Sequence, residues 1–330
     1  MTHCPQKVRL IGVLLLLCCF CPYFSDAQDD PAKWTLTRDL IVRPDGSPAS
    51  EEAGFLLSEL AAPGKEGEPV TQSELVSLLD NPEGQLVYYD RVIRYATPES
   101  DSLTKAEHEN YARIFMREKY QVAGVQFIKT HQRYLEGARS RFGVLPQDIV
   151  AILTWESGLG IFTGKNRVFN IMMGQILLMD RAQRYAVAEM VKAGKGNPLD
   201  DPSRRDAEAR RLARHKKDAT ASLVTLLRMA KKMQIDPLTI KGSWGGAIGY
   251  PQFLPYNLKY AVDADGNGID LLSWPDAIYS VANYLKERGE YGTSSAQRRK
   301  AFLRYNASQE YADGVMLLAD TIWRRYQQNP

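Results

Sequence analysis

The chain has 330 residues, of which 44% are hydrophobic and 25% are charged, a composition typical of a folded protein and not of a disordered or collagen-like one. Lysine and arginine number 42 against 39 for aspartate and glutamate, which gives a formal net charge of +3. This balance gives no reason to expect a nucleic acid as partner.

The first 27 residues have the layout of a secretory signal peptide. Lys7 and Arg9 precede an apolar run over residues 10–20, and small residues then mark a cleavage position before Gln28. An uncleaved transmembrane anchor is the alternative, but the apolar run is shorter than the ~20 residues that cross a bilayer. We therefore expect the protein to be periplasmic or secreted after signal cleavage.

All four cysteines lie within that segment, so the mature chain is expected to contain neither a disulfide nor a thiol nucleophile. The residues just before these cysteines are not the small ones that a lipoprotein signal uses. A lipid anchor is therefore disfavoured.

The next part of the chain changes character at residue 71. Proline, glycine and charged residues dominate positions 28–70, which predicts a loosely structured N-terminal arm. A Thr71 cap predicts a short helix ending near Asp80. Residues 86–93 are the best candidate for a strand.

Apolar residues at helical spacing predict further helices along the rest of the chain. They cover residues 104–142 with a break near Gly124, and then 146–158, 171–191 and 219–233. The polar segment 194–217 mixes basic with acidic residues, and it is interpreted as a solvated helix face in preference to a contact for an anionic polymer. The chain is thus expected to be mainly α-helical, as a lobed domain with a cleft.

One carboxylate has a sequence context suited to chemistry. Glu156 stands in TWESGLG (154–160), at the end of an apolar helix and directly before a glycine turn. Apolar neighbours disfavour the ionised carboxylate and raise its pKa, as a general acid at neutral pH requires. From the spacing alone, a glutamate on the surface at a helix end is the better interpretation.

A second motif, KGSWGGAIGYPQFLP (241–255), interleaves small residues with aromatic rings, an amide and a hydroxyl. Small residues let a polymeric ligand approach the backbone, while rings and amides suit sugars. A phosphate-binding loop is excluded because neither GxxxxGK[ST] nor a strand-linked GxGxxG is present.

Taken together, the blocks closely resemble the lytic murein transglycosylase B family of bacterial cell-wall enzymes. The resemblance rests on TWESGLG, GKNRV (164–168), DPL (236–238) and the 241–255 block, in the same order and with similar spacing, and it extends from about residue 71 to the C-terminus. It implies a lysozyme-like helical core with extra helical lobes. Residues 71–330 are therefore expected to form a lytic transglycosylase catalytic domain.

The resemblance also implies a mechanism. Glu156 would protonate the glycosidic oxygen between N-acetylmuramic acid (MurNAc) and N-acetylglucosamine (GlcNAc), and would then deprotonate the muramic 6-hydroxyl, which attacks C1 to form a 1,6-anhydro end without water. Residues that match substrate-side positions of the family are Ser243, Gln252, Phe253, Tyr284, Tyr305, Asn306 and Tyr311. Each could instead pack in the core, and this alternative is strongest for Phe253 and Tyr311.

A third motif, DADGNGID (263–270), places oxygen ligands at alternate positions around glycines, as in a calcium loop. The twelfth position is Trp274, which cannot bind a metal, but the resembling family closes a variant loop with a later aspartate. The ligands are then expected to be Asp263, Asp265, Asn267, the carbonyl of Ile269, and Asp276. Calcium or sodium would be the occupant of this loop (263–276) in a structural role, and no organic cofactor is expected. The alternative is a polar turn with capping aspartates.

The expected partners are peptidoglycan glycan strands, together with proteins of cell-wall synthesis or remodelling. Two other functions stay open at this stage. One is a peptidoglycan-binding protein without turnover, and the other is a lysozyme-type hydrolase, which usually needs a second carboxylate.

Overall fold

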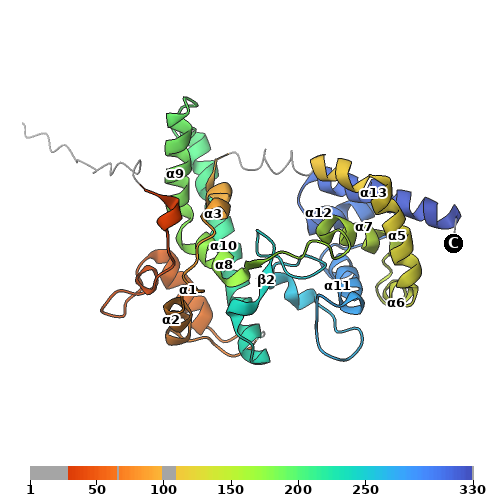
Figure 1. Cartoon of the computed structure of the whole chain (residues 1–330), viewed down its shortest axis with the longest axis horizontal. Coiled ribbons are helices and arrows are strands. Elements are labelled where there is room, and N and C mark those ends of the chain that lie inside the picture. Colours follow the sequence, from red (N-terminus) through yellow and green to blue (C-terminus); the bar gives the residue numbers. More distant parts are fainter. Residues whose placement is uncertain (1–28, 65–66, 99–108, 329–330) are drawn as a thin grey trace, which may run out of the picture.

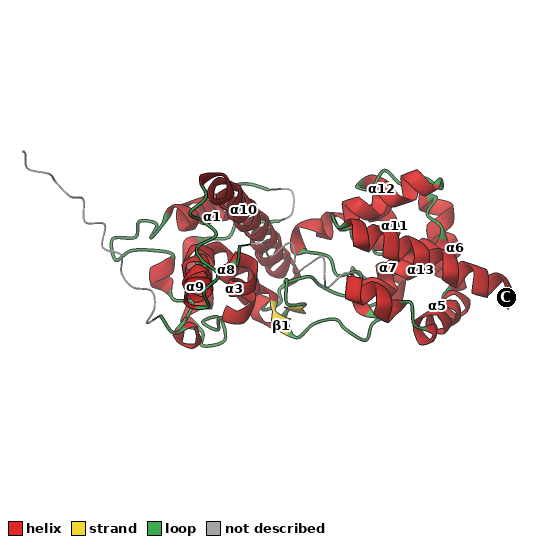
Figure 2. Cartoon of the chain, turned by 90° about the horizontal axis from the view of Figure 1, so that it is seen from above, coloured by secondary structure: helices red, strands yellow, loops and turns green. Residues whose placement is uncertain are grey.

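The computed structural model describes residues 29–64, 67–98 and 109–328. The predicted signal peptide lies outside these residues. Helices dominate the described part of the chain, as expected, and they gather in two lobes joined side by side (Figures 1 and 2). No helix in these ranges is long and apolar enough to cross a membrane.

The N-terminal lobe packs its helices around one apolar core, and the C-terminal lobe around another. Helices of the N-terminal lobe are α1 (Glu51–Ala61), α2 (Gln72–Asp80), α3 (Tyr89–Ala96), α8 (Val168–Leu177), α9 (Met179–Lys192) and α10 (Pro202–Met233). Helices of the C-terminal lobe are α5 (Glu118–Thr130), α6 (Gln132–Phe142), α7 (Pro146–Ser157), α11 (Trp274–Glu287), α12 (Ser295–Tyr305) and α13 (Gln309–Gln328).

A two-stranded antiparallel sheet lies where the chain passes between the lobes. Strand β1 (Asn166–Arg167) pairs with β2 (Lys241–Gly242), in the register Asn166 to Gly242. Residues 109–115 are also helical, and short 3₁₀ helices lie at η2 (Pro31–Lys33), η3 (Arg38–Leu40), η4 (Pro237–Thr239) and η5 (Pro255–Tyr260). The loop that follows β2 is therefore anchored at the junction of the lobes.

The expectation of a loosely structured arm over 28–70 is wrong for its described part. Trp34, Leu36 and Ile41 are buried in the core of the N-terminal lobe, and α1 packs against α8 and α10. The buried side chain of Arg228 on α10 donates a hydrogen bond of 2.9 Å to the carbonyl of Glu59 in the last turn of α1. Apolar residues are few among the prolines and charged residues of this segment, but Trp34, Leu36 and Ile41 are all buried.

Two further predictions need correction. Residues 86–93 do not form a strand, because α3 begins at Tyr89 and buries Val92 and Ala96, which lie one helical turn apart on the same face. The described part of 104–142 is broken at residues 116–117 and at His131, and not at Gly124. Gly124 instead lets α13 approach, since a Cβ at this position would come within 2.5 Å of Ile322.

The other helices lie where the sequence predicted them, but several differ in length from the predictions. Helix α2 begins with a complete capping box between Thr71 and Glu74, and α7 begins with a proline in its first turn, as predicted. The predicted helix 171–191 is divided at Leu178 into α8 and α9. Helix α10 starts at Pro202, so most of the polar segment 194–217 is helical, with its first part exposed.

Candidate active site

Helix α7 carries Glu156 into a cavity between the lobes. Pro146 occupies the first turn, and all residues of the helix except Glu156 are buried, so the helix is held by packing along its length. Gly158 ends it in the left-handed region at φ 59°, a conformation that glycine adopts without strain. The half-buried Glu156 in the last turn is thus presented by a rigid element.

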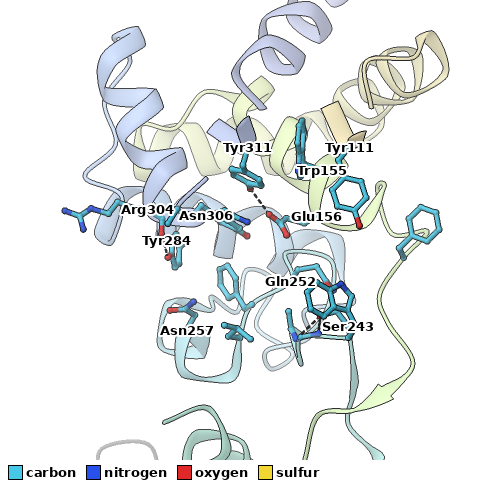
Figure 3. Close-up of a pocket in the computed structure, with 18 of the residues that line it drawn as sticks. Tyr111, Trp155, Glu156, Ser243, Gln252, Asn257, Tyr284, Arg304, Asn306 and Tyr311 are labelled. Atoms are coloured by element: carbon cyan, nitrogen blue, oxygen red, sulfur yellow. Dashed lines mark hydrogen bonds between the residues drawn. The ribbon is translucent and has the colours of Figure 1, made fainter. Parts of the chain in front are cut away.

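The cavity has a volume of about 890 Å³. Its walls come from α7, α12, α13 and the loop after β2, and Tyr95 of the N-terminal lobe also lines it. Figure 3 shows Glu156 and Tyr311 on one side of the cavity, with Ser243, Gln252 and Asn257 on the other. Among the described residues that line the cavity, Glu156 carries the one carboxylate.

Burial is the main influence on the acidity of Glu156. It raises the pKa of this carboxyl from the ordinary 4.5 to about 7, because the ionised form loses hydration. The Tyr311 hydroxyl donates a 2.6 Å hydrogen bond to Oε1 of Glu156, which favours the ionised form and offsets part of the effect. Near neutral pH the carboxyl is thus poised between its two protonation states.

A group of aromatic side chains supports this carboxyl. The rings of Tyr305 and Tyr311 are nearly parallel, with centroids 6.4 Å apart. Tyr305 donates a 2.6 Å hydrogen bond to the carbonyl of Pro251, and Tyr284 donates one of 2.8 Å to that of Arg304. Burial raises the pKa of Tyr284 to about 12, so its hydroxyl stays neutral and serves as a donor.

Phe253 and Tyr311 combine the two roles that the sequence left open. Both side chains are almost fully buried, at 2% and 1% exposure, yet both line the cavity. Phe253 contacts Tyr284 and Tyr305 through its ring and forms a wall. Tyr311 both fills the core and touches Glu156.

The loop after β2 brings Ser243 and Gln252 to the cavity. Oγ of Ser243 accepts hydrogen bonds from the amides of Gly245 and Ala247, at 3.2 and 3.1 Å, and so shapes the turn. Gln252 has φ 51°, unusual for a residue with a side chain, and its Nε2 donates a 2.7 Å hydrogen bond to the carbonyl of Gly249. A strained backbone of this kind persists only where the surrounding contacts enforce it, and such residues cluster at functional sites.

The structure brings the remaining predicted residue, Asn306, into the same cavity, together with residues that the sequence reasoning missed. The missed ones that Figure 3 labels are Tyr111, Trp155, Asn257 and Arg304. Trp155 and Arg304 directly adjoin predicted site residues. Tyr111 and Asn257 stand in no motif, so only the fold assigns them to the site.

The proposed metal loop lies outside this cavity. Carboxylate oxygens of Asp263, Asp265 and Asp276 lie within 4.8 Å of one another, so they can share one cation. Asp276 is fully buried, and its two oxygens accept hydrogen bonds of 2.8 Å from the amides of Ala264 and Asp270. Asn267 and Ile269 lie in the same loop and are exposed.

Comparisons with known proteins agree with this architecture. A family model described as the transglycosylase SLT domain matches residues 65–299. The membrane-bound lytic murein transglycosylase B of Escherichia coli (strain K12) is 34% identical over 168 residues, which are 50% of this chain. The match spans only 37% of the length of that relative.

Solved structures give the same answer for the fold. The Escherichia coli lytic transglycosylase SLT35 in complex with calcium has a TM-score of 0.60 at 21% identity, covering 91% of this chain and 99% of that one. The soluble lytic transglycosylase SltB1 of Pseudomonas aeruginosa has a TM-score of 0.50 at 24% identity, covering 66% and 83%. The lysozyme-like helical fold that the resemblance implied is confirmed.

Proposed function

The chain belongs to the transglycosylase SLT domain family, and from that premise we propose that it is a lytic transglycosylase of peptidoglycan. Its substrate is the glycan strand, and it cleaves the β-1,4 bond between MurNAc and GlcNAc. The observation that carries this proposal is that Glu156 is the one carboxylate among the described residues of the cavity wall, and its pKa of about 7 suits proton transfer in both directions.

The first step uses Glu156 as an acid. Its proton passes to the glycosidic oxygen as the bond from that oxygen to C1 of MurNAc breaks, and GlcNAc leaves with a free 4-hydroxyl. The positive charge that develops at C1 is steadied by the substrate's own N-acetyl group, so no second protein carboxylate is needed. Tyr311 stabilises the resulting Glu156 carboxylate through its 2.6 Å hydrogen bond.

The second step uses the same group as a base. The Glu156 carboxylate removes the proton of the muramic 6-hydroxyl, and that oxygen forms the new bond to C1. Glu156 regains its proton, water is neither consumed nor released, and the product has a 1,6-anhydro end. Retaining and inverting hydrolases usually need a second carboxylate to provide a nucleophile or activate water, which this cavity lacks among its described residues.

Substrate contacts follow from the cavity wall. Ser243, Gln252 and Asn306 present polar groups at its surface, and Tyr284, Tyr305, Tyr311 and Phe253 form the aromatic side. In this proposal the amides and hydroxyls hold the sugars through hydrogen bonds, while buried rings fix the position of the polar groups.

The deciding experiment is cleavage of purified sacculi in ¹⁸O-labelled water, followed by mass spectrometry of the products. A transglycosylase gives unlabelled anhydro ends that are lighter by one water than hydrolysis products. Labelled, reducible ends would instead identify a lysozyme-type hydrolase. Binding of sacculi without any product would identify a binding protein without turnover, and the Glu156→Gln variant serves as the control for background cleavage.

We further propose that loop 263–276 binds a structural cation, Ca²⁺ or Na⁺, through Asp263, Asp265, Asn267, the carbonyl of Ile269, and Asp276. Three convergent carboxylates support a hard cation with oxygen ligands. When bound, such a cation would cancel the repulsion between these carboxylates. It lies outside the cavity and takes no part in proton transfer.

We also propose that the protein acts outside the cytoplasm, after cleavage between Ala27 and Gln28. The composition of residues 1–27 supports this, together with a polymer substrate that lies in the cell wall. N-terminal sequencing of the mature protein from cell fractions tests it: a sequence that starts at Met1 would contradict cleavage.

A further inference from the structure

Three segments that differ in role meet just outside the cavity. They are the turn that follows Glu156, the substrate loop 249–252, and the end of the metal loop 263–276. At the meeting point the ring of Tyr250 stacks on that of Trp274, with centroids 3.8 Å apart and planes 20° from parallel. Neither ring lines the cavity, so any influence on substrate must pass through other residues.

The substrate loop is attached directly to the metal loop. The amide of Tyr250 donates a 2.9 Å hydrogen bond to the carbonyl of Leu271. Gly249 lies so close that an added Cβ would come within 2.4 Å of the Leu271 side chain. The carbonyl of Gly249 in turn accepts the hydrogen bond from Gln252, so a short chain of contacts runs from Leu271 to a cavity residue.

The turn after Glu156 rests on the same two rings. A Cβ added at Gly160 would approach Tyr250 to 3.0 Å and Trp274 to 3.1 Å, so only the bare backbone fits there. Gly160 also has φ 87°, which a side chain would strain. The stack therefore supports both Gln252 and the end of the helix that carries Glu156.

The other end of the stack is fixed to the metal loop and the core. Trp274 begins α11, two residues before Asp276, and its ring contacts Phe127 edge to face at 4.7 Å. Asp276 holds the amides of Ala264 and Asp270 and so closes the metal loop. If loop 263–276 becomes more or less ordered, the change reaches Trp274 through the first turn of α11.

We propose that Tyr250 and Trp274 form a positioning pair that transmits the order of loop 263–276 to Gln252 and to the turn after Glu156. This inference rests on the proposed function and on the proposed cation site. Cation binding then tightens glycan binding, and by reciprocity glycan tightens cation binding by the same factor. Tyr250 and Trp274 are positioning residues, since they touch neither substrate nor reacting atoms.

The test compares Tyr250→Leu, which removes the stacked ring, with Tyr250→Phe, which keeps it. Each change is combined with Glu156→Gln, so that a purified GlcNAc–MurNAc tetrasaccharide is bound without cleavage. Calorimetry gives the glycan Kd with CaCl₂ and with chelator. We expect calcium to tighten glycan binding at least fivefold in the protein with Tyr250 and in Tyr250→Phe, because fivefold is a typical lower limit for coupled sites. In Tyr250→Leu calcium should have no effect on glycan binding. Calcium should raise the Tm of all three proteins.

Hydrogen exchange adds a readout that does not depend on glycan. Calcium should protect the amides of residues 248–250, 252 and 253 in the parent protein and in Tyr250→Phe, but not in Tyr250→Leu. Asp263→Ala should abolish the calcium response everywhere. The proposal is overturned if Tyr250→Leu keeps the calcium effect on glycan binding, if Tyr250→Leu loses the calcium increment in Tm, or if calcium leaves these amides unprotected in the parent protein. Failure of the proposed function is distinguishable. If peptidoglycan is not the ligand, no variant binds glycan while the exchange of these amides still responds to calcium. If the chain is a hydrolase or a binding protein, the labelled-water experiment shows it, while the calcium effect on glycan binding still tests the positioning pair.

Discussion

Replacement of Glu156 by Gln should lower activity and at the same time raise stability at alkaline pH. Burial raises the pKa of Glu156 from the ordinary 4.5 to about 7. Because this folded-state pKa lies above the unfolded one, its contribution to stability is fully present below pH ~4.5 and is lost as pH rises through ~7. The loss amounts to about 3 kcal/mol, at 1.36 kcal/mol for each pH unit between the two pKa values.

Glutamine avoids this loss because it carries no charge at any pH, and its Oε1 can still accept the hydrogen bond from Tyr311. The variant should match the parent in stability at pH 4 and exceed it by about 3 kcal/mol at pH 8.5. For a chain of this size that is a rise in Tm on the order of 5 °C. Muropeptide release should fall by about 10² to 10⁴, as expected when acid-base catalysis is lost.

The assays are thermal unfolding at pH 4 and pH 8.5, and release of anhydro-muropeptides from sacculi at the pH optimum. Glu136→Gln is a matched control, because Glu136 lies on the exposed face of α6 and does not line the cavity. Near-normal turnover by the Glu156 variant would refute its role as the catalyst. Equal stability of parent and variant at pH 8.5 would refute the inferred high pKa.

Three further predictions follow from other contacts. Tyr311→Phe removes a hydrogen bond that lowers the pKa of Glu156, so the alkaline limb of the pH profile of kcat/KM should move to higher pH; a shift to lower pH would contradict this reasoning. Calcium at ~100 times its Kd should add ~2.7 kcal/mol of stability, and Asp263→Ala should abolish this increment in thermal unfolding; an unchanged parent Tm with calcium or chelator would remove the metal site. Arg298→Ala leaves the fully buried Asp148 without its 2.6 Å ion pair and should cost about 3 to 5 kcal/mol in urea unfolding, whereas Asp148→Asn combined with Arg298→Met should cost less.

The sequence was most informative where local chemistry decides structure. The capping box at Thr71 and Glu74 starts α2 whatever surrounds it, because both partners lie within one turn. The proline at the start of α7 and the glycine at its end likewise define that helix locally. The order of the motifs alone was sufficient to match the chain to one family and to assign Glu156, Ser243 and Gln252 to its site, although it could not give the distances between these residues.

Other features depended on contacts between distant residues. Trp34 and Leu36 stand in a segment whose composition predicted a loosely structured arm, yet both are buried in the core of the N-terminal lobe, where the ring of Trp34 meets that of Tyr185 on α9 edge to face. Residues 86–93 were predicted as a strand because their short apolar pattern does not distinguish a strand from a helix. In the structure Val92 and Ala96 are buried on one face of a helix, so this part of the segment forms α3.

The acidity of Glu156 shows the same division most clearly. Its neighbours in the sequence predicted the direction of the pKa shift, since Ile152, Leu153 and Trp155 next to it in α7 are apolar. The hydrogen bond from Tyr311, 155 residues away, and the absence of a second carboxylate among the described residues of the cavity wall arise only when α7, α13 and the loop after β2 meet. A carboxyl group responds to every group within a few ångströms, so its chemistry is a property of the folded chain, while the sequence determines which residue carries it.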